Sequence, residues 1–274
     1  MTAEIDNAFV SQFETDLHLA YQRMGSLIRN TVRTKNGIKG TDTTFQTAGR
    51  GTAGSKSRHG QVPIMNATRT PVLCTLADRY AGEWLDDLDT LKINHDERDV
   101  QVRTISYALG RDTDDTLTTA MDATTNANNV SSATTFTAAS VAIAVMEDMG
   151  GADIPFDGNL FAVMPWQGWG DLLDIDEFSN SDWIGETNIW FEGVTAKKWL
   201  GFNWFPHSGL PVDGSSDTKG FFYHRSSVGH AIGKDVELDI TWQGKEQAWL
   251  SVGKLSQGAV IIDHEGIIEF LYNT

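Results

Sequence analysis

The sequence predicts an α+β fold that carries one long extended arm. Two patterns predict the fold class: amphipathic helical periodicity recurs before residue 150, and short alternating strands follow residue 199. A glycine-rich, basic segment between the first helical patterns predicts the arm. With 274 residues, 40% of them hydrophobic, the chain is long enough to bury a large core.

The first pattern, residues 5–28, predicts an amphipathic helix. Its apolar side chains recur at spacings of three and four: Ile5, Phe9, Phe13, Leu17, Ala20, Tyr21, Met24 and Ile28. The polar face carries acids such as Glu4 and Glu14, whereas a membrane-surface helix would carry Lys and Arg. We therefore expect this apolar face to pack on protein.

Residues 31–70 predict the arm. They contain six glycines, many threonines and few large apolar residues, so they cannot bury a core of their own. Two short β-prone pieces, 43–47 and 62–65, flank a glycine-rich basic tip, which predicts a two-stranded ribbon. An isolated ribbon is marginally stable, so something must cover it.

Charge is divided unevenly along the chain. From Arg29 to Arg69 there are eight basic residues and one acid, a net charge of +7, whereas the remainder has 13 basic and 36 acidic residues, a net charge of −23. The whole chain, at −16 and a pI near 4.7, is excluded as a binder of phosphate backbones. A projecting arm of opposite charge to its own body is expected to lie on a neighbouring copy.

The helical elements after the arm are predicted in order. Residues 96–122 begin with Asp96 and Glu97 and space apolar residues by multiples of four, which predicts one helix of roughly 40 Å, with a break at Gly110 as an option. The pattern at 76–91 favours a connecting helix. A helix at 136–149 is expected to stop at Gly150 and Gly151, and a short helix at 165–173 to start at Pro165.

Alternating patterns predict the strands of the second half. They lie at 159–164, 199–205, 220–224, 236–242, 248–252, 259–262 and 267–272. Helices early and antiparallel strands late give the α+β class.

Motifs for chemistry are weak. Gly49, Gly51 and Gly54 satisfy GxGxxG, but no buried strand precedes them and no apolar-periodic helix follows, so a loop tip is favoured over a phosphate site. Cys74 is the single cysteine, which excludes a disulfide framework and a cysteine-based zinc site, and it fits a small apolar side chain in a strand. None of the seven histidines lies in a metal or triad motif. We expect no catalytic residue, cofactor or metal.

One alternative function class stays open, a carbohydrate-binding or glycoside-processing β-rich protein. Paired acids beside aromatic platforms are typical of sugar-processing sites. The candidates are Asp171, Asp174, Asp176 and Glu177, set among Trp166, Trp169, Trp183 and Trp190. No spacing among them fixes a distance between two carboxyl groups, so acid-rich helix ends and buried tryptophans are the favoured interpretation.

The N-terminus, MTAEIDN, has no basic residue before its first acids, and no run of about 18 apolar residues exists. We therefore expect neither a signal peptide nor a membrane span.

The order of these elements resembles the Hong Kong 97-type major capsid protein of tailed bacteriophages. TTFTAASVAIAVMEDMGG and GNLFAVMPWQGWGDLLDI are similar to a helix–strand–helix passage of that family's axial domain. WLGFNWFPHSGLP, GFFYHRSSVGHAIGKDVELDITW and LSQGAVIIDHEGIIEF are similar to its later strands.

The resemblance implies a division of the chain. Residues 1–30 would be the N-terminal arm, 31–75 the extended loop, 76–125 and 233–274 the peripheral domain with its long spine helix, and 126–232 the axial domain. Copies would form hexamers and pentamers of an icosahedral shell around double-stranded DNA, made in the bacterial cytoplasm and located in the virion. The basic residues expected at contacts between subunits are Arg33, Lys35, Lys39, Arg50, Lys56, Arg58 and Arg69.

The resemblance also has limits. Some members begin with a long scaffolding region that a protease removes, whereas here the arm helix starts at once, which implies a separate scaffold or none. A portal and a decoration protein are further candidate partners. No partner asparagine or acid matches a crosslinking site for Lys35, Lys39 or Lys56, so no crosslinking is predicted.

Overall fold

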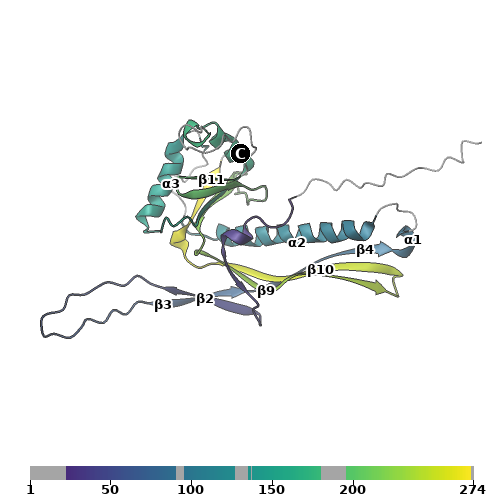
Figure 1. Cartoon of the computed structure of the whole chain (residues 1–274), viewed down its shortest axis with the longest axis horizontal. Helices are drawn as coiled ribbons and strands as arrows, with labels where there is room; N and C mark the ends of the chain where they lie inside the picture. The colour runs from purple at the N-terminus through teal and green to yellow at the C-terminus, as the bar shows by residue number, and fades with distance from the viewer. Residues whose placement is uncertain (1–22, 91–95, 127–134, 137, 180–195, 273–274) are drawn as a thin grey trace, which may run out of the picture.

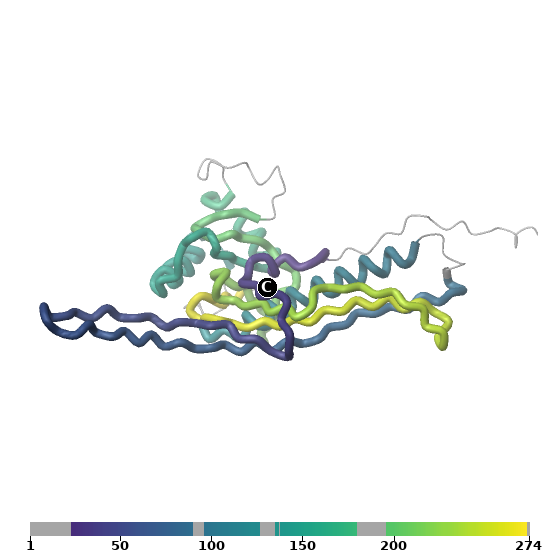
Figure 2. Tube along the Cα trace, turned by 60° about the horizontal axis from the view of Figure 1, so that its bottom comes forward, coloured from purple at the N-terminus to yellow at the C-terminus, as the bar shows by residue number. Residues whose placement is uncertain are grey.

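The computed structural model describes residues 23–90, 96–126, 135–136, 138–179 and 196–272, and it is elongated (Figure 1). A four-stranded sheet with a long helix forms a flat body. A five-stranded sheet with three helices forms a compact lobe on one side of it, and a two-stranded hairpin projects from one end (Figure 2). The predicted α+β class is confirmed.

The four-stranded sheet has the order β1-β9-β10-β4. Its strands are β1 (Arg33–Asn36), β9 (Val228–Gln243), β10 (Ala248–Ile261) and β4 (Ala77–Asp86). β10 is antiparallel to both neighbours, and the short β1 runs parallel to the start of β9. The far half of β9 and all of β4 are therefore sheet edges within the described residues.

The helix predicted at residues 96–122 is present as α2 (Glu97–Asp122), which covers β10 and β4 (Figure 1). Asp96 caps its N-terminus by accepting a hydrogen bond from the backbone N–H of Arg98. The helix is continuous at Gly110, where a side chain would place a Cβ 2.5 Å from the Cα of Gly25. Gly110 therefore serves close approach of the N-terminal segment, and no break occurs there.

The lobe is built on a sheet of order β11-β8-β5-β7-β6. Its strands are β5 (Leu160–Met164), β6 (Lys197–Trp199), β7 (Phe202–Pro206), β8 (Thr218–His224) and β11 (Ile267–Tyr272). The helices α3 (Ala139–Gly151), α4 (Trp166–Leu173) and α5 (Asp176–Ser179) accompany it. An aromatic core of edge-to-face contacts fills the lobe, with Trp204 and Phe222 fully buried and 5.3 Å apart between ring centroids.

A second cluster joins the lobe to the body. Leu117 and Met121 of α2 pack with Tyr223 of β8 and with Ile28 and Val32 of the N-terminal segment, all fully buried. The buried face of α2 thus packs against both the sheet of the body and the lobe.

The prediction of a helix at 76–91 is wrong. β4 occupies most of this range, and only the four-residue α1 (Asp87–Thr90) is helical. The apolar side chains do not share one face: Leu85 is buried, whereas Trp84 is 51% exposed. Ten consecutive residue pairs with β10 decide the conformation, because tertiary pairing overrides a short helical pattern.

The predicted helix at 5–28 lies mainly outside the described residues. Residues 23–28 are not helical, and only η2 (Arg29–Thr31), a single 3₁₀ turn, follows them. Gly25 has a left-handed φ of 71°, and the N–H groups of Leu27 and Ile28 bind a side chain of α2 in place of helical carbonyls.

Two strand predictions also differ from the structure. β2 (Asp42–Ala48) pairs with β3 (Arg69–Thr75), so residues 62–65 precede the second strand of the arm. β10 is one strand of 14 residues where two were predicted. Beyond β10 the chain returns to the lobe, where β11 pairs with β8.

Candidate assembly interface

The hairpin arm, residues 42–75, packs against the body at its base. Phe45 of β2 and Cys74 of β3 are buried against Ala231 and Ile262. Cys74 therefore has the predicted structural role, and burial raises the pKa of its thiol. The backbone of Leu76 also donates a hydrogen bond to the carbonyl of Thr41, 2.9 Å away. Beyond this base the arm runs away from the body and exposes both faces (Figure 2).

The GxGxxG motif lies in this exposed part, as a loop, as predicted. A Cβ on Gly51 would lie 2.2 Å from the sulfur of Met65, and one on Gly54 would lie 2.9 Å from the ring of Pro63. The glycines let the two limbs of the arm approach each other. This packing explains the spacing of the glycines, so no bound phosphate is needed to explain it.

The predicted contact residues fall into two groups. Within the chain, Arg33 lies over the ring of Phe45, and Lys35 donates to the hydroxyl of Thr43. Arg50, farther along the arm, binds the lobe: its guanidinium pairs with Asp153 at 3.4 Å and with Glu265 at 2.8 Å. The other four have no ion pair among the described residues: Lys39, Lys56, Arg58 and Arg69.

The opposite end of the molecule is acidic. Residues 83–90, 96–99 and 237–247, which lie at the far ends of β4, β9 and β10 and at the start of α2, carry 10 acidic and two basic residues, a net charge of −8. No acid occurs between Thr43 and Ala77, which includes the whole arm beyond Asp42. Both views place the tip of the arm and the turn between β9 and β10 at opposite ends of the long axis (Figures 1 and 2).

Asp114 of α2 fixes the point where the N-terminal segment enters the body. Its carboxylate is fully buried and accepts hydrogen bonds from the hydroxyl of Ser26 at 2.5 Å and from the N–H groups of Leu27 and Ile28 at 3.1 Å each. Nε2 of His207, just after β7, lies 3.0 Å from the same carboxylate. We call these residues, together with Arg23, the Asp114 anchor.

The charge of Asp114 is stabilised where it lies. Burial by itself raises the pKa of this carboxyl, but the hydrogen bonds from His207, Ser26, Leu27 and Ile28 outweigh it, so the pKa lies below its ordinary value. Nε of Arg23 adds an ion pair at 3.4 Å. The anchor therefore holds a paired, ionised carboxylate between the N-terminal segment, α2 and the lobe.

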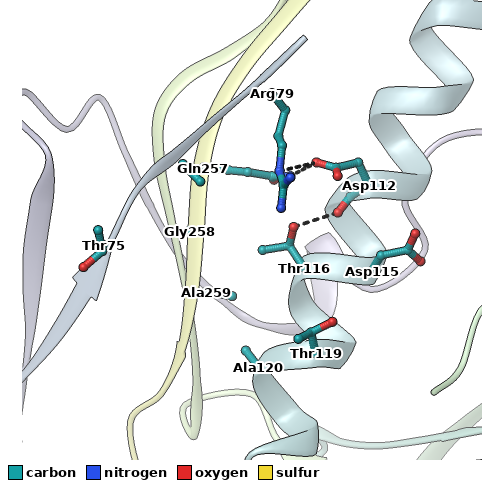
Figure 3. A pocket seen from close by; sticks show the side chains of 11 residues that line it. Thr75, Arg79, Asp112, Asp115, Thr116, Thr119, Ala120, Gln257, Gly258 and Ala259 are labelled. Carbon is teal, nitrogen blue, oxygen red and sulfur yellow. Dashed lines mark hydrogen bonds and ion pairs between the residues drawn. The ribbon is translucent and has the colours of Figure 1, made fainter. Parts of the chain in front are cut away.

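A pocket of about 330 Å³ lies beside the base of the arm, between β4, β10 and α2 (Figure 3). Asp112 points into it and binds both Arg79, at 3.5 Å, and the amide of Gln257, at 3.1 Å. At one wall Gly258 lies so close to β3 that an added Cβ would be 2.2 Å from the carbonyl oxygen of Thr75. Its charged groups are paired and its other polar groups are mainly threonines, so we assign it to the joint between arm and body.

Of the candidate acids, Asp171 and Asp174 line a pocket of about 290 Å³ with Thr135, Phe136 and Ile175. No group of three His, Cys, Asp or Glu side chains among the described residues is placed to hold a metal ion. Asp171 accepts a hydrogen bond from the hydroxyl of Tyr272, and Trp169 is buried in the lobe. Trp183 and Trp190 lie outside the described residues. In the described part of the chain, no helix has the length and apolar character to cross a bilayer.

The sequence matches the model of the phage capsid protein family over residues 5–274. The chain belongs to this family. No curated protein matches it. Solved capsid structures share its fold at low identity. The capsid of cyanophage P-SCSP1u aligns with a TM-score of 0.75 at 13% identity, over 100% of this chain and 96% of that one.

Two further capsid structures agree. The Mycobacterium phage Che8 structure gives a TM-score of 0.74 at 15% identity, over 96% of this chain and 97% of that one. The capsid of a native GTA particle gives a TM-score of 0.74 at 12% identity, over 99% of this chain and 98% of that one. The predicted Hong Kong 97-type fold is thereby confirmed, and the chain is a structural protein of a phage capsid. The carbohydrate alternative has no support.

Reasoning from sequence missed the Asp114 anchor. One signal was present: Asp114 lies on the same face of α2 as Leu117 and Met121, and an acid on an apolar face requires a buried partner. Its partners, Arg23 and His207, are far away in sequence, and no local pattern connects them to α2.

Proposed function

We propose that copies of this chain assemble head to tail into the hexamers and pentamers of an icosahedral phage head, with the hairpin arm of each subunit lying on the acidic end of the next. The observation that carries this proposal is the placement of opposite charges at opposite ends of one elongated subunit. Contacts between two different surfaces are heterologous, and they close into rings when the rotation fits.

The division of the chain follows from this arrangement. The four-stranded sheet with α2 corresponds to the peripheral domain and spine helix, the five-stranded lobe to the axial domain, and residues 42–75 to the extended loop. The N-terminal arm enters at the Asp114 anchor. The basic residues that form no ion pair among the described residues, Lys56 and Arg58 foremost, form ion pairs with the neighbouring subunit.

The surrounding partners follow from the same role. The shell encloses double-stranded DNA without sequence-specific binding, and its net negative charge avoids a strong grip on the phosphate backbone. The subunit is made in the bacterial cytoplasm and resides in the virion. A separate scaffold, a portal and a decoration protein are the other partners that such a shell would use.

Charge reversal tests the proposal. Lys56→Glu with Arg58→Glu is expected to prevent shells at low salt, as seen by electron microscopy and light scattering, while the circular dichroism of the subunit stays unchanged. Arg50→Glu is the control for this double variant, because Arg50 already forms ion pairs within its own chain. Normal shells from the double variant at low and high salt would refute the intersubunit role of the arm.

A further inference from the structure

A pocket of about 320 Å³ lies where the start of the four-stranded sheet meets the lobe. Its lining comes from three segments that are far apart in the sequence: β1, the residue before β5, and the end of β8 with the turn that follows it. The lining residues are Arg33, Thr34, Asn159, His224, Arg225 and Ser226. Both parts of the subunit therefore contribute to one pocket.

The pocket carries positive charge in a chain whose net charge is −16. Two arginines line it, and none of its lining residues is an acid. Neither Arg33 nor Arg225 forms an ion pair among the described residues, and both side chains are exposed. Two like charges that share one pocket repel each other, and a bound anion would replace this repulsion with attraction.

The acid beside the pocket, Asp157, is already engaged. Its Oδ1 atom accepts the backbone N–H of Asn159 at 3.0 Å and lies 3.2 Å from Nε2 of His224. Hydrogen bonds from Asn159, with a smaller share from His224, lower the pKa of Asp157 to about 2. On the other side of the ring, Nδ1 of His224 accepts the N–H of Ser226, so the imidazole is neutral. The negative charge of Asp157 is thus directed to His224, and the two arginines keep no counter-charge.

The walls of the pocket are fixed in the unliganded chain. His224 is only 7% exposed. The guanidinium of Arg33 lies over the buried ring of Phe45, 5.7 Å from its centroid. The backbone N–H of Arg225 donates to the carbonyl of Asn159 at 3.0 Å, which holds the turn after β8 against β5. A ligand would therefore meet a site whose backbone is already ordered, which lowers the entropic cost of binding.

The donors of this pocket fit one chemical group. A guanidinium presents its N–H donors in a planar fork that matches the oxygens of a phosphate, and a phosphate has enough oxygens to accept from two such forks. The hydroxyl of Thr34 adds a neutral donor. We propose that this pocket binds a phosphate group, with Arg33 and Arg225 as its charged ligands. The group belongs either to free phosphate or a nucleotide, or to the backbone of the DNA that the proposed shell encloses. Binding of free phosphate does not depend on the shell.

Titration calorimetry with inorganic phosphate, on the unassembled full chain in a chloride buffer, tests the site. Saturable binding of one phosphate per subunit is expected. Arg33→Gln combined with Arg225→Gln should weaken this binding about tenfold or more, because it removes both charged ligands. Arg58→Gln is the matched control, since Arg58 is exposed, forms no ion pair among the described residues and lies on the arm. Absence of saturable binding, or equal affinity in the double variant, would overturn the proposal.

A single variant separates binding from stability. Arg33 also packs on Phe45, so the double variant changes stability as well as charge. Arg225→Gln, in an exposed turn, is expected to keep the melting temperature that the unaltered protein has without phosphate. It should lose the upward shift that phosphate gives the unaltered protein, because only a bound ligand stabilises the folded state. A shift of full size in Arg225→Gln would overturn the role of this residue.

A short DNA duplex distinguishes the two sources of the phosphate group. A duplex that displaces inorganic phosphate from the unaltered protein, and that no longer binds the double variant, assigns the site to the DNA backbone. A duplex that leaves bound phosphate in place assigns the site to free phosphate or a nucleotide. An acid of a second copy is the competing occupant. A density map of assembled particles that shows an Asp or Glu of a neighbour between the two arginines would overturn the phosphate site.

Discussion

Replacing Asp114 with alanine tests the main structural argument about the N-terminal segment. The substitution removes the acceptor of four hydrogen bonds and leaves the buried side chains of Arg23 and His207 without this carboxylate. Removing one partner of a buried ion pair costs about 3–5 kcal/mol. The free energy of unfolding of the unassembled subunit should fall by about this amount.

Two assays measure the effect. Guanidinium unfolding followed by tryptophan fluorescence gives the free energy, and limited trypsin digestion reports release of the segment by faster cleavage after Arg23 and Arg29. Asp115→Ala is the matched control, because its side chain is 62% exposed and has only a 3.5 Å contact with Arg23. A loss below about 1 kcal/mol with unchanged digestion would show that the anchor does not hold the segment.

The same residue predicts a pH dependence. The pKa of Asp114 in the folded chain lies below its ordinary value of 3.8, so the unfolded chain binds the proton more readily. The stabilisation is present above pH 3.8 and is lost as the pH falls through the lower folded value. Asp114→Asn should flatten that part of the stability curve, and an unchanged acid slope would contradict the assignment.

Three further predictions concern close packing and a buried histidine. Gly110→Ala, which by helix propensity alone would stabilise α2 by about 1 kcal/mol, should instead destabilise the subunit through its clash with Gly25, and a raised melting temperature would refute this. Gly258→Ala should cost about 1–3 kcal/mol and loosen the base of the arm, seen as faster digestion at Lys56 and Arg58, whereas Gly244→Ala, in open space, should not. Burial lowers the pKa of His230 despite its hydrogen bond to Gln257, so the unfolded chain takes up the proton before the folded chain does. The contribution of His230 to the free energy of unfolding therefore falls as the pH drops below 6.5. His230→Gln should remove that slope from the unfolding free energy, and an unaltered slope would show that His230 does not titrate as argued.

Local patterns in the sequence were sufficient for several elements. The 26-residue α2 was predictable because its cap, its acidic first turn and its apolar spacing all agree within one segment. The arm was predictable from what it lacks, since a segment with one acid and few large apolar side chains cannot form a core of its own. The uneven charge along the chain predicts a contact between copies, and this stays a prediction.

Tertiary structure decided what depended on distant residues. β4 forms a strand because β10 pairs with it, and its own apolar spacing favoured a helix. Asp114 can be buried as an ionised carboxylate because Arg23, Ser26 and His207 bind it from positions up to 93 residues away in the sequence. The exposure of Ile240 and Trp242 on β9 depends on where α2 crosses the sheet. Pairings of this kind are set by long-range packing, which no window of sequence contains.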